Sequence, residues 1–196
     1  MSGQNLPHTS GVAEQRSSKV SIVGMGSVGT AIAYACLIRG SAKALALYDV
    51  NAKKVQAEVL DLNHGSQFVP NCVVTGSDSV EVTAGSAIVL VTAGAKQKPG
   101  QSRLDLAATN VAMAQTLTPQ LLEHSPDAVI IFVTNPVDLV TYAAATSVDV
   151  PHGRIFGSGT VLDSSRFRYL IGRRAAVDVG NVHGFFFGDP AASEIP

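Results

Sequence analysis

A glycine-rich turn, Gly-Met-Gly-Ser-Val-Gly at residues 24–29, constrains the fold of this chain more than any other feature. It follows a short apolar run at residues 20–23 and precedes residues 30–39, which have the composition of a helix. In such a turn the first glycine permits a tight bend, the second lets a phosphate group approach the backbone, and the third lets the helix pack closely on the strand. Free N–H groups at the start of the helix favour an anion. An isolated turn of this kind also fits a simple packing bend, so its context must decide.

Short apolar runs alternate with longer helical segments along the rest of the chain. Strands are predicted at residues 20–23, 44–48, 87–91 and 128–133, with a further short strand starting at Val73, and helices at residues 30–39, 53–62 and 104–123. The strands are continuous aliphatic runs, which is typical of strands buried on both faces. Alternation of strand and helix therefore predicts an α/β fold with a doubly wound parallel sheet of the Rossmann type.

Unusual residues stand at the carboxyl ends of four predicted strands. The glycine turn ends the first strand, Asp49 the second, residues 92–95 (Thr-Ala-Gly-Ala) the fourth, and residues 134–136 (Thr-Asn-Pro) the fifth. Open α/β sheets bind ligands at this edge, where the strand order reverses. Asp49 stands 20 residues after Gly29, where an acid accepts hydrogen bonds from an adenosine ribose. The charge of Asp49 would repel the 2′-phosphate of NADP, so we expect NAD as the cofactor. The alternative is that Asp49 only helps to form a turn in a loop.

Composition excludes several classes of protein. The chain has 196 residues, of which 46% are hydrophobic, so it can form a sizeable core. Its net charge of -1 gives no basic footprint for nucleic acid. The longest apolar run, residues 84–95, is too short and interrupted to cross a membrane, and residues 1–17 lack the apolar core of a secretory signal. Cys36 and Cys72 have no metal-ligand spacing, so we expect no metal site and reduced thiols in a cytoplasmic protein.

Three later segments complete a more specific pattern. They are TAGAKQKPGQSRL at residues 92–104, TNPVD at residues 134–138 and GSGTVLDSSRFR at residues 157–168. Together with the glycine turn, their order and spacing resemble the L-lactate/malate dehydrogenase family over about residues 18–188. The resemblance implies a cytoplasmic, NAD-dependent oxidoreductase that interconverts L-lactate and pyruvate at the fermentative end of glycolysis. It also implies a homotetramer.

The resemblance assigns roles to individual residues. Those that match the family's NAD site are Gly24, Gly26, Val28, Gly29, Asp49, Lys54, Gly94, Ala95, Thr116, Val133, Asn135 and Ser158. Those that match its substrate site are Gln97, Arg103, Asn135, Asp138, Asp163 and Arg166, of which Arg103, Asp163 and Arg166 match catalytic residues.

Asp163 and Arg166 are three positions apart, about 60° around a helix axis, so they share one helix face. The resemblance implies that Arg166 holds the substrate carboxylate as a two-pronged fork. It also implies that Asp163 orients a catalytic histidine and stabilises its charged form. The alternative is a surface ion pair of small energy.

By the same resemblance, Arg103 follows a loop that closes over the substrate and brings this arginine to the carbonyl oxygen. Asn135 would hydrogen-bond the substrate oxygen. For Arg103, the alternative is a solvated arginine at the start of a helix. For Asn135, the alternative is a turn residue before Pro136, and the peptide bond between Asn135 and Pro136 could be cis. Malate dehydrogenases carry arginine at the position of Gln97, to pair with a second carboxylate. The neutral Gln97 therefore favours pyruvate over oxaloacetate, and malate remains the alternative substrate.

Arg168 lies about 200° around the helix from Arg166 and cannot serve the same site. In allosteric bacterial members of the family, residues matching Arg168 and His183 bind fructose 1,6-bisphosphate at a subunit interface. The alternative is a surface arginine and an unrelated histidine. His64, His124 and His152 have no comparable context.

The last residues depart from the family pattern. The family's catalytic histidine is the proton donor and acceptor, and Pro190 stands at the matching position. Residues 182–187 are predicted to form a hydrophobic strand. We expect a mobile arm at residues 1–17, an NAD-binding domain at residues 18–160, and only the start of a truncated substrate domain at residues 161–196. A non-catalytic fragment that binds NAD is therefore an alternative to an active dehydrogenase.

Overall fold

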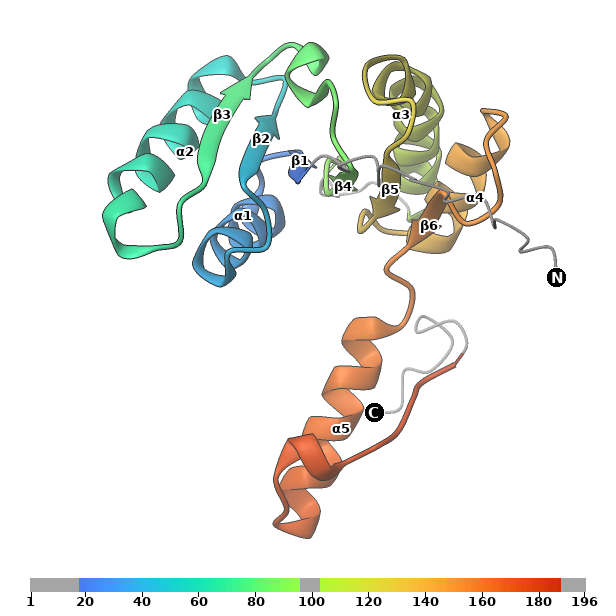
Figure 1. Cartoon of the computed structure of the whole chain (residues 1–196). Coiled ribbons are helices and arrows are strands. Elements are labelled where there is room, and N and C mark those ends of the chain that lie inside the picture. The colour runs from blue at the N-terminus through green and yellow to red at the C-terminus, as the bar shows by residue number, and fades with distance from the viewer. Residues whose placement is uncertain (1–17, 96–102, 188–196) are drawn as a thin grey trace, which may run out of the picture.

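A six-stranded parallel sheet forms the centre of the molecule, in the order β3-β2-β1-β4-β5-β6. Figure 1 shows the computed structural model, which describes residues 18–95 and 103–187. The strands are β1 (Lys19–Val23), β2 (Ala44–Tyr48), β3 (Val73–Ser77), β4 (Ile88–Val91), β5 (Val129–Phe132) and β6 (Ile155–Gly157). The predicted doubly wound parallel sheet is confirmed.

Within the described residues, five α-helices connect or follow these strands. They are α1 (Ser27–Arg39), α2 (Ala52–His64), α3 (Arg103–His124), α4 (Val137–Thr146) and α5 (Val161–Ala175). Short 3-10 turns lie at η1 (Ser66–Phe68), η2 (Val80–Thr83) and η3 (Val179–Asn181). In the described part of the chain, no helix is both long and apolar enough to cross a membrane.

Alternating strand residues divide the core between the two faces of the sheet. Ile22 and Leu90 belong to the cluster that contains the buried residues of α1 and α2. Val89 and Val91, which alternate with Leu90, belong to the cluster that contains the buried residues of α3 and α4. Helices therefore cover both faces, which explains why strands β2, β4 and β5 are apolar at every position.

The strand order reverses beside β1. Its neighbours are β2 on one side and β4 on the other, and both pair with it in parallel register. The carboxyl ends of β1, β2, β4 and β5 consequently lie along one edge of the sheet. This is the position at which doubly wound sheets leave room for a ligand.

The segment at residues 182–187 differs from its prediction, because it forms no strand. It runs along α5, which extends away from the sheet in Figure 1. Side chains hold its backbone in place: Thr160 Oγ1 donates to Phe186 O at 2.6 Å, and the Phe186 N–H donates to Ser164 Oγ at 2.9 Å. Arg168 Nε donates to Gly184 O at 2.7 Å. Three backbone groups of this segment, Gly184 O, Phe186 N–H and Phe186 O, are thus bonded to side chains of α5 and of Thr160 and not to a neighbouring strand.

Candidate functional site

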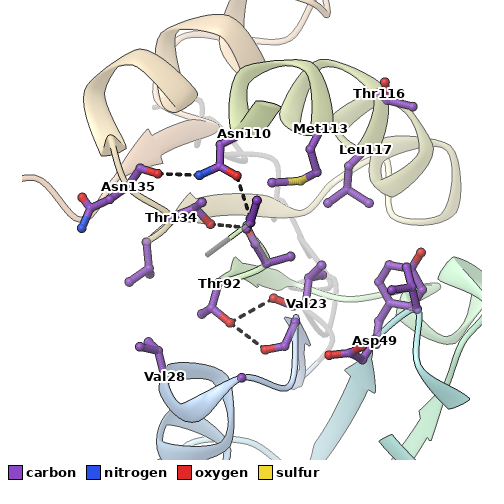
Figure 2. Close-up of a pocket in the computed structure, with 18 of the residues that line it drawn as sticks. Val23, Val28, Asp49, Thr92, Asn110, Met113, Thr116, Leu117, Thr134 and Asn135 are labelled. Atoms are coloured by element: carbon purple, nitrogen blue, oxygen red, sulfur yellow. Dashed lines mark hydrogen bonds between the residues drawn. The ribbon is translucent and has the colours of Figure 1, made fainter. Parts of the chain in front are cut away.

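A cavity of about 1000 Å³ opens at the edge of the sheet where the strand order reverses (Figure 2). Residues from four strand ends and from α3 line it. Ten of the twelve residues matched to an NAD site are among them, namely Gly24, Gly26, Val28, Asp49, Lys54, Gly94, Ala95, Thr116, Val133 and Asn135. The structure thus brings together residues that are as far apart as positions 24 and 135 in the sequence.

The three glycines of the turn have different surroundings. A Cβ atom added to Gly24, whose φ is 92°, would lie 2.5 Å from the Ala93 backbone nitrogen. A Cβ on Gly29 would lie 2.0 Å from the Gly24 carbonyl oxygen. These two positions therefore exclude side chains because the backbone is packed there. A Cβ on Gly26 would meet nothing within 4 Å, so Gly26 leaves open space beside the backbone and lines the cavity.

The first turn of α1 is suited to an anion. Gly26 is the N-cap residue and supplies no capping side chain, and the first turn contains no acidic residue. N–H groups and the positive end of the helix dipole therefore face the open space beside Gly26. This cradle fits the pyrophosphate of a dinucleotide.

Asp49 lies at the end of β2 and is joined to its surroundings through both carboxylate oxygens. Oδ2 accepts from the Met25 N–H at 2.7 Å, and Oδ1 accepts from the Asn51 N–H at 3.0 Å. Lys54 Nζ lies 3.5 Å from Oδ2, and the Asp49 side chain is 13% exposed. A carboxylate has about four acceptor positions, so Asp49 retains capacity to accept from ribose hydroxyls.

Two buried or half-buried threonines join the strand ends to each other. Thr92 Oγ1 donates to Gly24 O at 2.7 Å, which fixes the end of β4 against the glycine turn. Thr134 Oγ1 donates to Ala93 O at 2.6 Å, which fixes the end of β5 against the end of β4. The floor of the cavity is therefore held by side-chain bonds between neighbouring loops.

Asn110 on α3 was not identified from the sequence. Its side chain is buried, with 2% exposed, and lines the cavity. Oδ1 accepts from the Ala95 N–H at 2.8 Å, and Nδ2 donates to Asn135 O at 2.8 Å (Figure 2). One sequence signal could have identified Asn110: it is a polar residue at helical spacing from Ala107, Ala114 and Leu117, which lie on the buried face of α3.

Asn135 is exposed at the cavity, and its bond to Pro136 is cis. Asp138 lies in the first turn of α4, is exposed, and does not line the cavity. Gly29 packs behind the turn, and Ser158 lines a smaller cavity beside α5.

Asp163 and Arg166 share a face of α5, as their spacing indicates. Arg166 Nη1 lies 3.4 Å from Asp163 Oδ1, and the side chains are 61% and 21% exposed, respectively. Neither residue lines the large cavity. The described structure therefore places this pair apart from the cofactor site.

Arg168 is engaged within the chain. Besides its bond to Gly184 O, its guanidinium lies 4.7 Å from the centre of the Phe185 ring. His183 is exposed and directly precedes Gly184. The two residues matched to an effector site are thus on segments that pack against each other.

Three predicted positions cannot be placed in the site. Gln97 and Pro190 lie outside the described residues. Arg103 is the first residue of α3, but its side chain is not described.

The reversal of strand order, the open glycine turn and the acid after β2 define a dinucleotide-binding α/β domain of the doubly wound class. Residues 18–157 match the family model described as "lactate/malate dehydrogenase, NAD binding domain". The chain belongs to the lactate/malate dehydrogenase family and contains its NAD-binding domain. The predicted family and cofactor are confirmed.

Named relatives agree with this assignment. The chain is 46% identical over 179 residues to an L-lactate dehydrogenase of Bifidobacterium animalis subsp. lactis, covering 91% of this chain and 56% of the relative. It is 44% identical over 177 residues to one of Synechococcus sp., covering 90% of this chain and 58% of the relative. The crystal structure of a minor L-lactate dehydrogenase from Enterococcus mundtii has a TM-score of 0.85 and 40% identity, covering 89% of this chain and 56% of that chain. The chain therefore spans a little over half the length of these relatives.

Proposed function

We propose that the protein is an NAD-dependent L-lactate dehydrogenase, which interconverts L-lactate and pyruvate. The observation that carries the proposal is the cavity at the strand reversal, which is lined by the cradle residue Gly26, the acceptor Asp49 and Asn135, with Asp49 and Asn135 on opposite sides in Figure 2. Bound NAD supplies the hydride acceptor for lactate oxidation. The chain's own residues must then orient the substrate, while the hydroxyl proton must pass to a base, which is the role of the family's histidine at the position of Pro190.

The residues of the nucleotide half have separable tasks in this proposal. The N–H groups at the start of α1 hold the pyrophosphate, and Asp49 accepts from the adenosine ribose. Asn135, at the opposite end of the cavity, donates its side-chain amide to the substrate oxygen. Gly94, Ala95, Thr116 and Val133 also line this cavity.

Substrate orientation is assigned to α5. Arg166 is mostly exposed and its contact with Asp163 is long, so the guanidinium is available to pair with a carboxylate. Asp163 would hold a proton-transferring group in place, and Arg103 would stabilise charge on the carbonyl oxygen. Domain bounds at residues 18–160 and 161–196 are part of this proposal, with α5 at the start of the substrate domain.

Pyruvate is proposed over oxaloacetate because Gln97 is neutral. In a protein with a complete substrate domain, Gln97→Arg should raise kcat/KM for oxaloacetate relative to pyruvate, since the added charge pairs with the second carboxylate. An unchanged ratio would reject this basis for specificity.

A second candidate function, NAD binding without catalysis, is favoured by Pro190. The family's proton-transferring histidine is replaced there, and proline has no titratable group. General acid–base catalysis contributes roughly 10²–10⁴-fold. Pyruvate-dependent NADH oxidation, measured beside NADH binding on the same preparation, tests both candidates: binding with turnover supports the dehydrogenase, and binding without turnover supports the second function.

Regulation and assembly are proposed from the family resemblance. Arg168 and His183 would bind the phosphates of fructose 1,6-bisphosphate in a homotetramer, which is supported by the packing of their two segments together. Arg168→Gln should abolish activation by this compound if the proposal is right. Activation that persists in the variant would reject it.

A further inference from the structure

The side chain of Asn110 lies between the two loops that form the far end of the cavity. It stands on α3, and its two polar atoms face different strands: Oδ1 accepts from the Ala95 N–H after β4, and Nδ2 donates to Asn135 O after β5, both at 2.8 Å. Figure 2 shows the amide spanning this gap. Such a bridge requires one acceptor and one donor in a single buried side chain.

We propose that Asn110 is the positioning residue for the substrate end of the site. The proposal rests on the proposed function, in which Asn135 contacts the substrate. Because Asn110 holds the backbone carbonyl of Asn135 while the rest of that residue is exposed at the cavity, it sets the direction in which the Asn135 amide is presented.

The bridge acts at a different place from the other loop contacts. Thr134 already joins the ends of β4 and β5 through Ala93 O, close to the sheet. Asn110 joins the same two loops farther along, at Ala95 and Asn135, where both line the cavity. Loss of the amide should therefore leave the sheet and the cradle at Gly26 in place while it releases the substrate end.

The substitution Asn110→Asp tests the hydrogen bond to Ala95 and the hydrogen bond to Asn135 separately. An ionised Asn110→Asp side chain keeps an acceptor for the Ala95 N–H but has no proton for Asn135 O. Burial, and the carbonyl oxygen opposite, favour the neutral acid and raise the pKa of such a group above its ordinary value of about 3.9. Once protonated, the acid can accept from Ala95 and donate to Asn135, so lowering the pH should restore the bridge.

Charged groups on the packed elements must be controlled. They are Arg103, Asp105, Glu123 and His124 on α3 and Asp138 on α4, and all five are present in every variant. Gln115→Glu is the matched control, because Gln115 is exposed on the same helix and outside the cavity lining. It makes the same amide-to-acid change without touching either loop.

The test uses the full 196-residue chain with NADH and pyruvate. At pH 8, Asn110→Asp should lower kcat/KM for pyruvate by roughly tenfold or more, with the Kd of NADH within about threefold of the unchanged chain. The kcat/KM of Asn110→Asp, divided by that of Gln115→Glu, should rise as the pH is lowered toward the raised pKa of the acid introduced by Asn110→Asp. Where the unchanged chain reduces pyruvate, equal kinetics for the two variants, or a deficit that does not change with pH, would overturn the proposal.

A readout without turnover keeps the inference distinct from the proposed function. In the ¹⁵N-labelled chain with NADH bound, Asn110→Asp should shift the NMR signals of the Asn135 side-chain amide at pH 8 and return them at low pH. Gln115→Glu should do neither. If the unchanged chain binds NADH but does not reduce pyruvate, the proposed dehydrogenase activity is rejected. The NMR signals of the Asn135 side-chain amide then test the role of Asn110 by themselves. Unmoved Asn135 signals in Asn110→Asp would then reject the role of Asn110.

Discussion

The carboxylate of Asp49 accepts a hydrogen bond from the backbone N–H of Met25 at 2.7 Å, so the end of β2 is joined directly to the glycine turn after β1. Met25 itself is buried, with 1% exposed, and lies between Gly24 and Gly26. One side chain therefore holds the glycine turn and, in the proposed function, also offers acceptors to the ribose. The two roles can be separated by substitution.

The first prediction concerns cofactor preference. Asp49→Ser and Asp49→Asn both remove the negative charge that repels a 2′-phosphate, so each should raise the affinity for NADP relative to NAD by about tenfold or more. Asn can still accept from the Met25 N–H, whereas Ser is too short, so Asp49→Ser should also lower the melting temperature more. Calorimetric titration with both cofactors measures the ratio. An unchanged chain that binds NADP as tightly as NAD would contradict the role of Asp49.

The elements of the nucleotide half were largely predictable because their signals are local. Continuous aliphatic runs mark strands covered on both faces, and the predicted strands at residues 20–23, 44–48 and 87–91 agree with β1, β2 and β4 to within one residue. The edge strand β6 has three residues and was missed, because so short a run has no usable pattern. Helix α4 was missed as well.

The candidate site was predictable only where backbone topology fixes it. Parallel strands bring their carboxyl ends to one edge, so the order of strands and helices in the sequence is enough to place Asp49 and Asn135 at the same edge of the sheet. Helix periodicity places Asp163 and Arg166 on one face of α5, but it says nothing of where that helix stands relative to the sheet. The bridge made by Asn110 depends on the distance between two loops, which no sequence pattern encodes.

A stability prediction follows from Arg154, which precedes β6. Its Nε and Nη2 donate to Ala128 O at 3.1 and 3.0 Å, and Nη2 also donates to Pro126 O at 2.8 Å. Arg154→Met should lower the free energy of unfolding by about 1–3 kcal/mol, because the partly buried bonds to Ala128 O and the exposed bond to Pro126 O are lost. Denaturant unfolding measures the loss. The exposed Lys53→Met is the control, and an equal effect of the two variants would show that the Arg154 bonds add nothing.

The two cysteines make a prediction about alkaline pH. Burial raises the pKa of the Cys36 thiol from its ordinary value of 9.0, and burial is also the largest cause of the raised pKa of Cys72. A raised folded-state pKa contributes stability that is present below the unfolded value and is lost as the pH rises through the folded value. The unfolding free energy should therefore fall as the pH rises above about 9.

Alkylation by iodoacetamide tests the same thiols directly. The thiolate is the reactive form, so both cysteines should react more slowly than free cysteine at pH 8. Cys36→Ser and Cys72→Ser, each leaving one thiol, assign the rates. A rate equal to that of free cysteine for either thiol would show that burial does not protect it.

The final prediction separates cofactor binding from folding within one turn. Gly26 has φ −78° and ψ −178°, which any residue adopts, and a Cβ there meets no atom within 4 Å. Gly26→Val should therefore fold with a nearly unchanged melting temperature, while its side chain fills the space proposed for pyrophosphate and weakens NADH binding by about a hundredfold or more. Gly29 gives the opposite case, because its Cβ would lie 2.0 Å from Gly24 O.

Gly29→Ala should accordingly lower the melting temperature sharply, since helix α1 must move away from the turn to admit one methyl group. Thermal unfolding followed by circular dichroism, with NADH titration at a temperature where each variant is folded, separates the two effects. Full NADH affinity in a folded Gly26→Val variant would place the pyrophosphate elsewhere. An unchanged melting temperature in Gly29→Ala would mean that the close packing of α1 on the glycine turn is not required.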